Sequence, residues 1–153
     1  MPPFVSASAL VEQDDHLLVV FDPIRGEPIL PGGHLKWREK PEAALTREVR
    51  EETGLDIDPL EIVAVLSGPE WAGESGVVRI VFAGRVIGGS LASSGEGEAA
   101  WLPMSRVYTE MTRDAPVVRL WLERSTNGRS RVKGRADAPR RPEARSGPGA
   151  DRG

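Results

Sequence analysis

Three glutamates at helical spacing are the residues of this chain best suited to carry chemistry. Glu48, Glu51 and Glu52 stand at positions i, i+3 and i+4, which on an α-helix places them within an arc of about 100°. Like charges this close repel one another and destabilise an isolated helix. Carboxylate oxygens suit hard cations such as Mg²⁺, which typically binds through a few carboxylates together with substrate phosphates. The spacing therefore favours a site where a divalent cation neutralises the glutamates.

Residues on either side of the glutamates mark the ends of a helix. Pro41 suits the first helical position, where its missing N–H costs no hydrogen bond, and Gly54 suits the position just after the last turn. Leu45 and Val49 are four residues apart and form an apolar stripe beside the acidic one. We expect one helix with its apolar stripe buried and its acidic stripe facing a cleft. The preceding residues 30–33 predict a strand end that runs into a tight loop.

The segment from Gly33 to Leu55 resembles the Nudix box. That family pattern is Gly, five residues, Glu, seven residues, Arg-Glu, an aliphatic residue, any residue, Glu-Glu, any residue, Gly and an aliphatic residue. Every defining position is matched, by Gly33, Glu39, Arg47, Glu48, Val49, Glu51, Glu52, Gly54 and Leu55. The flanking pattern extends the resemblance to about residues 3–123. Two less constrained positions depart from common usage, because Arg38 replaces a frequent Gly and Lys40 replaces a Ser or Thr that often caps the helix.

The resemblance implies a Mg²⁺-dependent hydrolase that cleaves a diphosphate linkage in a nucleoside diphosphate derivative, with Mn²⁺ as a substitute metal. A nucleoside triphosphate or an ADP-ribose-like molecule would be the small-molecule substrate. The resemblance makes Glu51 and Glu52 the main metal ligands and Glu48 a ligand and the general base or its partner. Arg47 would hold a carboxylate in one rotamer. Glu39 would either add to the metal site or order the loop, and Gly33 would let backbone carbonyl or amide groups approach the metal or phosphate.

Other candidate residues lie outside the glutamate helix, and each has a plainer alternative. Glu96 and Glu98 qualify as the additional acidic ligand or base that relatives often carry, or else they are exposed loop acids. His34, Trp37 and Trp71 are candidate substrate contacts; for His34, a loop histidine without a special role is the alternative. The glutamate face itself has an alternative as a merely solvated helix surface, which the complete box disfavours. Pro69 lies near a proline of ADP-ribose-cleaving relatives, but a single proline is also an ordinary turn residue.

Length and composition bound the class of protein. The chain has 153 residues, a net charge of −3 and no cysteine, which predicts a single domain without disulfides or thiolate metal sites. It contains no apolar run of about 18 residues and no basic start followed by an apolar core, so we expect neither a membrane span nor a secretion signal. A cytoplasmic location fits these features. A homodimer is left open.

The C-terminal segment differs in composition from the rest of the chain. Residues 124–153 carry nine Lys and Arg against three Asp and Glu, a net charge of +6 that leaves −9 for the remainder. Gly, Pro, Arg and Ser dominate residues 125–153, and such a segment cannot bury enough apolar surface to offset its ordering entropy. The sequence predicts a hydrolase domain over 1–124 and a disordered basic tail over 125–153. Binding of nucleic acid by this tail is left open.

The order of apolar segments predicts an α/β fold. Expected strands cover residues 4–11, 16–21, 29–30, 60–67, 77–87 and 99–102, the first two forming a hairpin, and further helices begin at 103–108 and cover 115–124. Mixed strands with helices between them predict a sheet flanked by helices, in agreement with the α/β/α sandwich that the Nudix resemblance implies. The alternative function is a non-catalytic nucleotide sensor or adaptor of the same fold with a nucleic-acid-binding tail.

Overall fold

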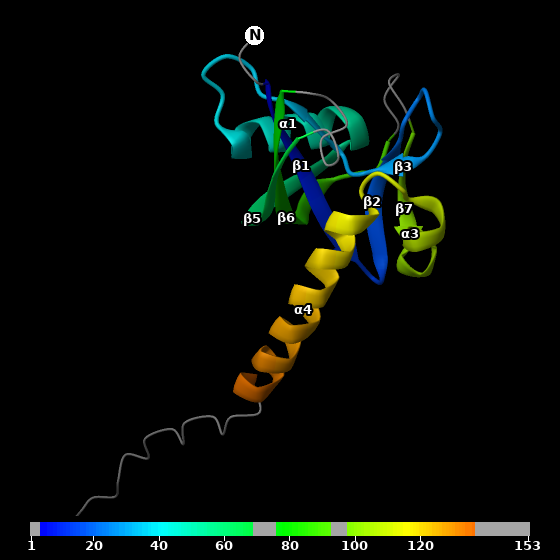
Figure 1. Cartoon of the computed structure of the whole chain (residues 1–153), viewed down its shortest axis with the longest axis vertical. Coiled ribbons are helices and arrows are strands. Elements are labelled where there is room, and N and C mark those ends of the chain that lie inside the picture. The colour runs from blue at the N-terminus through cyan, green and yellow to red at the C-terminus, as the bar shows by residue number, and fades with distance from the viewer. Residues whose placement is uncertain (1–3, 69–75, 93–97, 137–153) are drawn as a thin grey trace, which may run out of the picture. The chain divides into compact units, whose positions relative to one another are not determined.

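A computed structural model describes residues 4–68, 76–92 and 98–136, and side chains as far as Ser125. Its strands are β1 (Phe4–Gln13), β2 (His16–Phe21), β3 (Pro28–Ile29), β4 (Gly32–His34), β5 (Leu55–Ser67), β6 (Val77–Gly89) and β7 (Ala99–Pro103), and its helices are α1 (Pro41–Thr53), α3 (Met104–Glu110) and α4 (Ala115–Ala136) (Figure 1). The chain divides into two units, residues 1–118 and 119–153. The first unit contains every strand together with α1, α3 and the start of α4.

The sheet of the first unit is mixed and is centred on β1. Its strand order is β3-β2-β1-β6-β5, with β4 paired to β1 and β7 paired to β2. β1 runs parallel to β6 and antiparallel to β2 and β4. β1 and β2 form the predicted hairpin, and the mixed sheet is confirmed. Because β4 pairs with the first half of β1, the glycines at 32 and 33 are fixed against the centre of the sheet.

Helix α1 packs its apolar stripe against this sheet. Leu45 and Val49 are fully buried and belong to a core cluster that also contains Ala7, Ala9, Val11, Leu18, Leu55, Ile57 and Phe82. Helix α1 lies beside β1, β4 and β5, whereas α3 lies beside β2 and β7 (Figure 1). The sheet is therefore flanked by helices, and the α/β fold expected from the sequence is confirmed. Burial of the Leu45 and Val49 stripe turns the glutamate stripe away from the core.

The ends of α1 match the local signals in the sequence. Pro41 occupies the first turn, and Lys40 stands at the N-cap with no hydrogen bond from its side chain. At the other end, Gly54 has a φ of 80° and donates its N–H to the Arg50 carbonyl. A Cβ at Gly54 would lie 2.4 Å from the Ser90 carbonyl oxygen, so glycine is required there for both conformation and space.

Two elements extend more than two residues beyond their predicted bounds. β5 begins at Leu55 instead of residue 60, and irregular pairing with β6 around Pro59 accommodates a proline inside the strand. α4 continues to Ala136, whereas the sequence predicted a helix end near Arg124 and no structure from residue 125. Arg, Lys and Ala in that stretch favour helix formation, whereas its two glycines and its Ser, Thr and Asn do not. Residues 137–153 lie outside the described residues, so the division into a domain and a disordered tail stays a prediction.

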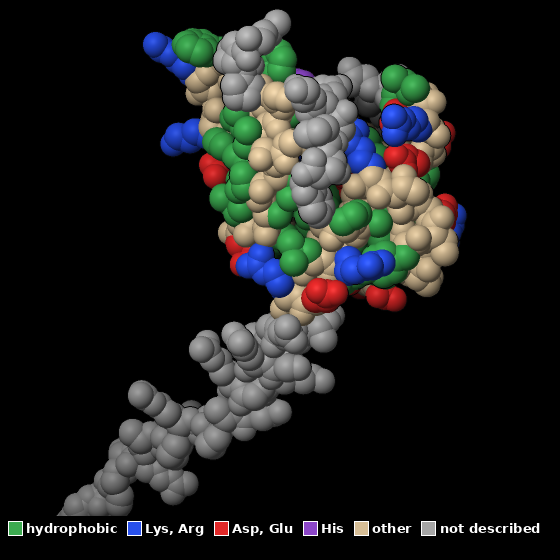
Figure 2. Space-filling model, in the orientation of Figure 1, with side chains coloured by type: hydrophobic (Ala, Val, Ile, Leu, Met, Phe, Trp, Pro, Cys, Tyr) green, Lys and Arg blue, Asp and Glu red, His purple; other side chains and the backbone are tan. Residues whose placement is uncertain are grey.

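Apolar side chains gather at the edge of the sheet formed by β5 and β6. Leu60, Ile62, Val65 and Ile87 are each at least 50% exposed, and Figure 2 shows hydrophobic side chains gathered on the part of the surface where these strands lie.

Within the described part of the chain, no helix combines the length and apolar character needed to cross a membrane. The homodimer stays a prediction.

Candidate active site

Arg47 is at the centre of the acidic face of α1. Its Nε and Nη2 each donate to one oxygen of Glu39 at 2.8 Å, and its Nη1 donates to Glu48 Oε1 at 2.8 Å and to Glu51 Oε2 at 3.4 Å. Nη2 also donates to the backbone carbonyl of His34 at 3.2 Å. The paired bonds to Glu39 give this contact the directional strength of a bidentate ion pair. One side chain therefore fixes the loop before α1 relative to two of the three helix glutamates.

The pairing with Arg47 determines the charge state of Glu39. Hydrogen bonds from Arg47, and then from the Lys36 backbone N–H at 2.9 Å, lower the pKa of Glu39 from 4.5 to about 2. The same contact, followed by the bond to Glu48, raises the pKa of Arg47 further above its usual value. Glu39 is thus ionised at neutral pH and held by the arginine. Of the two roles expected for Glu39, these contacts support ordering of the loop.

Two glycines bring backbone directly against the helix glutamates. A Cβ at Gly33 would lie 2.4 Å from Cδ of Glu48 and 2.6 and 2.7 Å from its two oxygens. The Gly32 N–H donates to Glu52 Oε1 at 3.4 Å, and a Cβ at Gly32 would lie 2.1 Å from the Ala7 carbonyl oxygen of β1. We call residues 30–33 the glycine loop. Its backbone is confined between β1 and the carboxylates of α1, with no room for a side chain at either glycine.

The donor set on α1 fits a hard divalent cation in its chemistry. Glu48, Glu51 and Glu52 offer only carboxylate oxygens, and the Glu51 side chain is 57% exposed, which leaves it accessible from solvent. Among the described residues, however, no three or more His, Cys, Asp or Glu side chains are arranged to hold a metal ion. Ion pairs with Arg47 hold Glu48 and Glu51 instead.

The remaining sequence candidates differ in their contacts and in their exposure to solvent. His34 contributes its carbonyl to Arg47, while its ring is stacked on Phe4 with the ring centroids 5.3 Å apart. Trp37 is 89% exposed. Glu98 is exposed just before β7, and its backbone carbonyl accepts a hydrogen bond from the Phe21 N–H at 3.0 Å. Glu96, Pro69 and Trp71 lie outside the described residues. The roles expected for all these side chains stay predictions.

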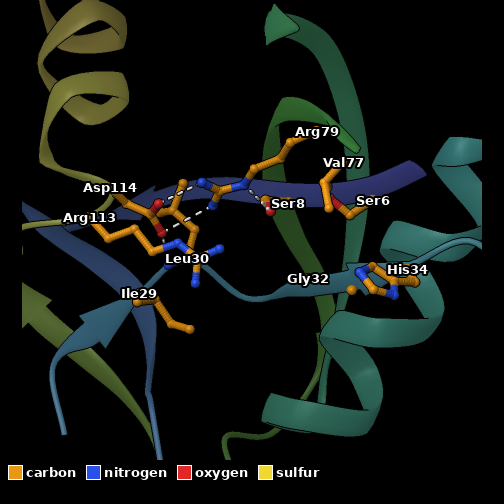
Figure 3. A pocket seen from close by; sticks show the side chains of 11 residues that line it. Ser6, Ser8, Ile29, Leu30, Gly32, His34, Val77, Arg79, Arg113 and Asp114 are labelled. Atoms are coloured by element: carbon orange, nitrogen blue, oxygen red, sulfur yellow. Dashed lines mark hydrogen bonds and ion pairs between the residues drawn. The ribbon is translucent and has the colours of Figure 1, made fainter. Parts of the chain in front are cut away.

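A cavity lies against the glycine loop. It has a volume of about 170 Å³, and its walls include Ser6, Ser8, His34 and Arg79 together with both glycines (Figure 3). The sequence analysis did not single out Arg79. Its one signal in the sequence is a single charge inside the apolar run of residues 77–83, because a charge that is buried in a strand requires a partner.

Comparison with known proteins identifies the family. The NUDIX domain model matches residues 2–122. The chain is 34% identical over 101 residues to an ADP-ribose pyrophosphatase of Methanocaldococcus jannaschii, covering 64% of this chain and 60% of that protein. It is 37% identical over 115 residues to the 8-oxo-dGDP phosphatase NUDT18 of Homo sapiens, covering 70% of this chain and 34% of that protein. The matched regions thus span less than two thirds of both relatives.

A solved structure agrees with the sequence matches. The crystal structure of an ADP-ribose pyrophosphatase from Streptococcus suis superposes with a TM-score of 0.66 at 25% identity, covering 80% of this chain and 92% of that one. The mixed sheet flanked by helices is thus a fold that this chain shares with Nudix enzymes. The chain belongs to the Nudix hydrolase family, and the box at residues 33–55 is the segment that forms the loop, helix and acidic face described above.

Proposed function

We propose that this chain is a divalent-cation-dependent pyrophosphohydrolase that cleaves a diphosphate linkage in a nucleoside diphosphate derivative. The observation that carries the proposal is the packing of the Gly32–Gly33 backbone directly on the carboxylates of Glu48 and Glu52. Backbone this close to two carboxylates could offer its N–H and carbonyl groups to a metal or phosphate bound between them. Family membership supports the same reaction class.

The helix glutamates would hold the metal. Bound Mg²⁺ supplies two kinds of chemistry in such a site, neutralisation of phosphate charge and a lowered pKa for coordinated water. Glu51 and Glu52 are the proposed ligands, and Glu48 is the proposed ligand and general base. Arg47 donates to Glu48 Oε1 and keeps that carboxylate oriented. Mn²⁺ would occupy the same oxygen ligands.

The cavity beside the glycine loop is the proposed place of the nucleoside. Gly32 and Gly33 line it and also contact the helix glutamates, so a molecule bound there would present its diphosphate to the acidic face. The hydroxyls of Ser6 and Ser8 offer hydrogen bonds to a polar ring system. The printed activities of the relatives, on ADP-ribose and 8-oxo-dGDP, share a nucleoside diphosphate. That shared group is the substrate class we propose, without a choice between the two.

A phosphate and nucleotide release screen tests the proposal. The purified 153-residue chain is incubated with nucleoside triphosphates, ADP-ribose, 8-oxo-dGDP and dinucleotide polyphosphates, each with and without Mg²⁺. We expect Mg²⁺-dependent cleavage of at least one of them, lost in Glu52→Gln and retained in Glu42→Gln. Glu42 is a matched control, because it is an exposed glutamate of the same helix outside the Arg47 network. Nucleotide binding without cleavage of any compound would instead identify the non-catalytic sensor.

A further inference from the structure

A buried ion pair lies on the other side of the cavity from the helix glutamates. Arg79 on β6 donates from Nη1 and Nη2 to the two carboxylate oxygens of Asp114 at 2.6 and 3.0 Å, and from Nε to the Ser8 hydroxyl at 2.9 Å. The two side chains are only 8% and 1% exposed. Figure 3 shows the pair spanning the space between β1, β6 and the residues before α4. The contact joins residues that are 35 positions apart in the chain.

Stability alone is a weak explanation for such a pair. Removing two charges from water costs several kcal/mol per ion, on the order of what their attraction returns, and well-packed apolar residues often serve as well. The carboxylate of Asp114 makes a further contact that apolar residues could not make. Its Oδ2 accepts the backbone N–H of Leu30 at 2.8 Å, a bond that is buried within the first unit.

The bond to Leu30 fixes the start of the glycine loop. The next residue, Pro31, accepts the Ala9 N–H through its carbonyl at 2.9 Å, and Gly32 then pairs opposite Ser8 of β1. The loop is therefore attached to β1 on one side and to Asp114 at its beginning. Arg79 bonds to both Asp114 and Ser8, and so orients the acceptor of the Leu30 N–H relative to the strand that holds Gly32.

We propose that Arg79 and Asp114 are positioning residues for the glycine loop, and through it for Glu48 and Glu52. This inference rests on the proposed function. The Leu30 N–H bond sets where the loop backbone leaves β3, two residues before Gly32. The Gly33 backbone lies directly against the Glu48 carboxylate, and the Gly32 N–H donates to Glu52 Oε1. A loop released from Asp114 would therefore misplace the two carboxylates, although neither positioning residue contacts them.

Double variants that differ only at position 114 separate positioning from structural support. Arg79→Met with Asp114→Asn removes both charges but keeps a side-chain oxygen that can accept the Leu30 N–H. Arg79→Met with Asp114→Leu removes both charges and the acceptor. Arg79→Met with Asp114→Ala also lacks the acceptor, and it replaces the leucine variant if that chain does not fold. Arg79 is replaced in all three variants. A change in KM that they share is therefore due to loss of the Arg79 side chain from the cavity wall.

The readouts are Mn²⁺ affinity, measured by electron paramagnetic resonance of the free ion, and kcat and KM on the compound selected by the release screen. We expect the asparagine variant to keep more of the wild-type kcat and Mn²⁺ affinity than the variants without an acceptor, because its side-chain oxygen can still accept the Leu30 N–H. The leucine or alanine variant should lose about tenfold or more in both, at a temperature where thermal unfolding shows each chain to be folded.

The outcomes distinguish this inference from the proposed function. Equal Mn²⁺ affinity and kcat in the variants with and without the acceptor would overturn the positioning role and leave the hydrolase proposal intact. A wild-type chain that neither binds Mn²⁺ nor cleaves any compound in the screen would overturn the proposed function, and the inference with it.

Discussion

Substitution of Gly33 by alanine tests how closely the loop backbone must approach the metal-site glutamates. The added Cβ would lie 2.4 Å from Cδ of Glu48, whereas ordinary van der Waals contact begins near 3.4 Å. The Glu48 carboxylate must therefore move by about 1 Å. The obstructing atoms are the end of a flexible side chain, so we expect the backbone to keep its place and the fold to survive.

The expected cost falls on turnover. A displacement of about 1 Å in a catalytic group lowers rates by about 10²-fold, which corresponds to about 2.7 kcal/mol of activation free energy. We expect kcat of Gly33→Ala to fall about 10²-fold at saturating Mg²⁺, with a Tm within a few degrees of wild type.

The assay compares kcat and Tm of Gly33→Ala with those of Gly88→Ala. Gly88 is a suitable control because the nearest atom to its added Cβ is Asp56 Oδ2 at 3.5 Å, an ordinary contact. Wild-type kcat in Gly33→Ala would refute the claim that the loop backbone positions Glu48 for the reaction. A large loss of Tm in Gly33→Ala alone would show that the glycine serves packing instead.

Three further predictions concern α1, its loop and the C-terminal segment. Lys40→Ser should add the missing N-cap bond, stabilise the fold by about 1 kcal/mol and raise the Tm by about 2–4 °C relative to Lys40→Ala. Because the pKa of Glu39 is lower in the folded chain, its pairing stabilises the fold above pH 4.5 and is lost as the pH falls toward about 2. The Tm of wild type should therefore exceed that of Glu39→Gln at pH 7 and approach it near pH 2; a constant difference would contradict this. A chain ending at Thr126 should keep its Tm and its activity on small nucleotides, because every buried apolar residue of the described chain lies at or before Val118; loss of activity with the fold retained would show that residues 127–153 contact substrate.

Local sequence signals were sufficient to predict α1 and its surroundings. Pro41, the stripe of Leu45 and Val49, and Gly54 act within a few residues of one another, so their effects do not depend on the rest of the fold. Apolar runs bounded by turn residues likewise predicted most strands. The early start of β5 was missed because Pro59 is normally a signal against a strand, and only the irregular pairing with β6 accommodates it.

Local sequence patterns could not predict contacts between residues that are far apart in the chain. Sequence spacing offered Glu48 and Glu51 as neighbours of Arg47, but the paired bonds of its guanidinium go to Glu39, eight residues earlier. The loop path that brings Glu39 there depends on Arg38, which adopts a φ of 65° where the family often has glycine. The pairing of Arg79 with Asp114 depends on the placement of β6 beside β1 and is absent from any local periodicity.

Thermal unfolding in Mg²⁺ tests the central claim, a metal site on the acidic face of α1, most directly, because it requires no knowledge of the substrate. A cation that binds only the folded chain adds about 2.7 kcal/mol at a concentration of 100 Kd, which should raise the Tm by about 5–10 °C. We predict this shift in the wild type with Mg²⁺, and little of it in Glu51→Gln with Glu52→Gln or in Na⁺ of equal ionic strength. A wild-type Tm that is unchanged by millimolar Mg²⁺, or that rises equally in Na⁺, would contradict the metal site.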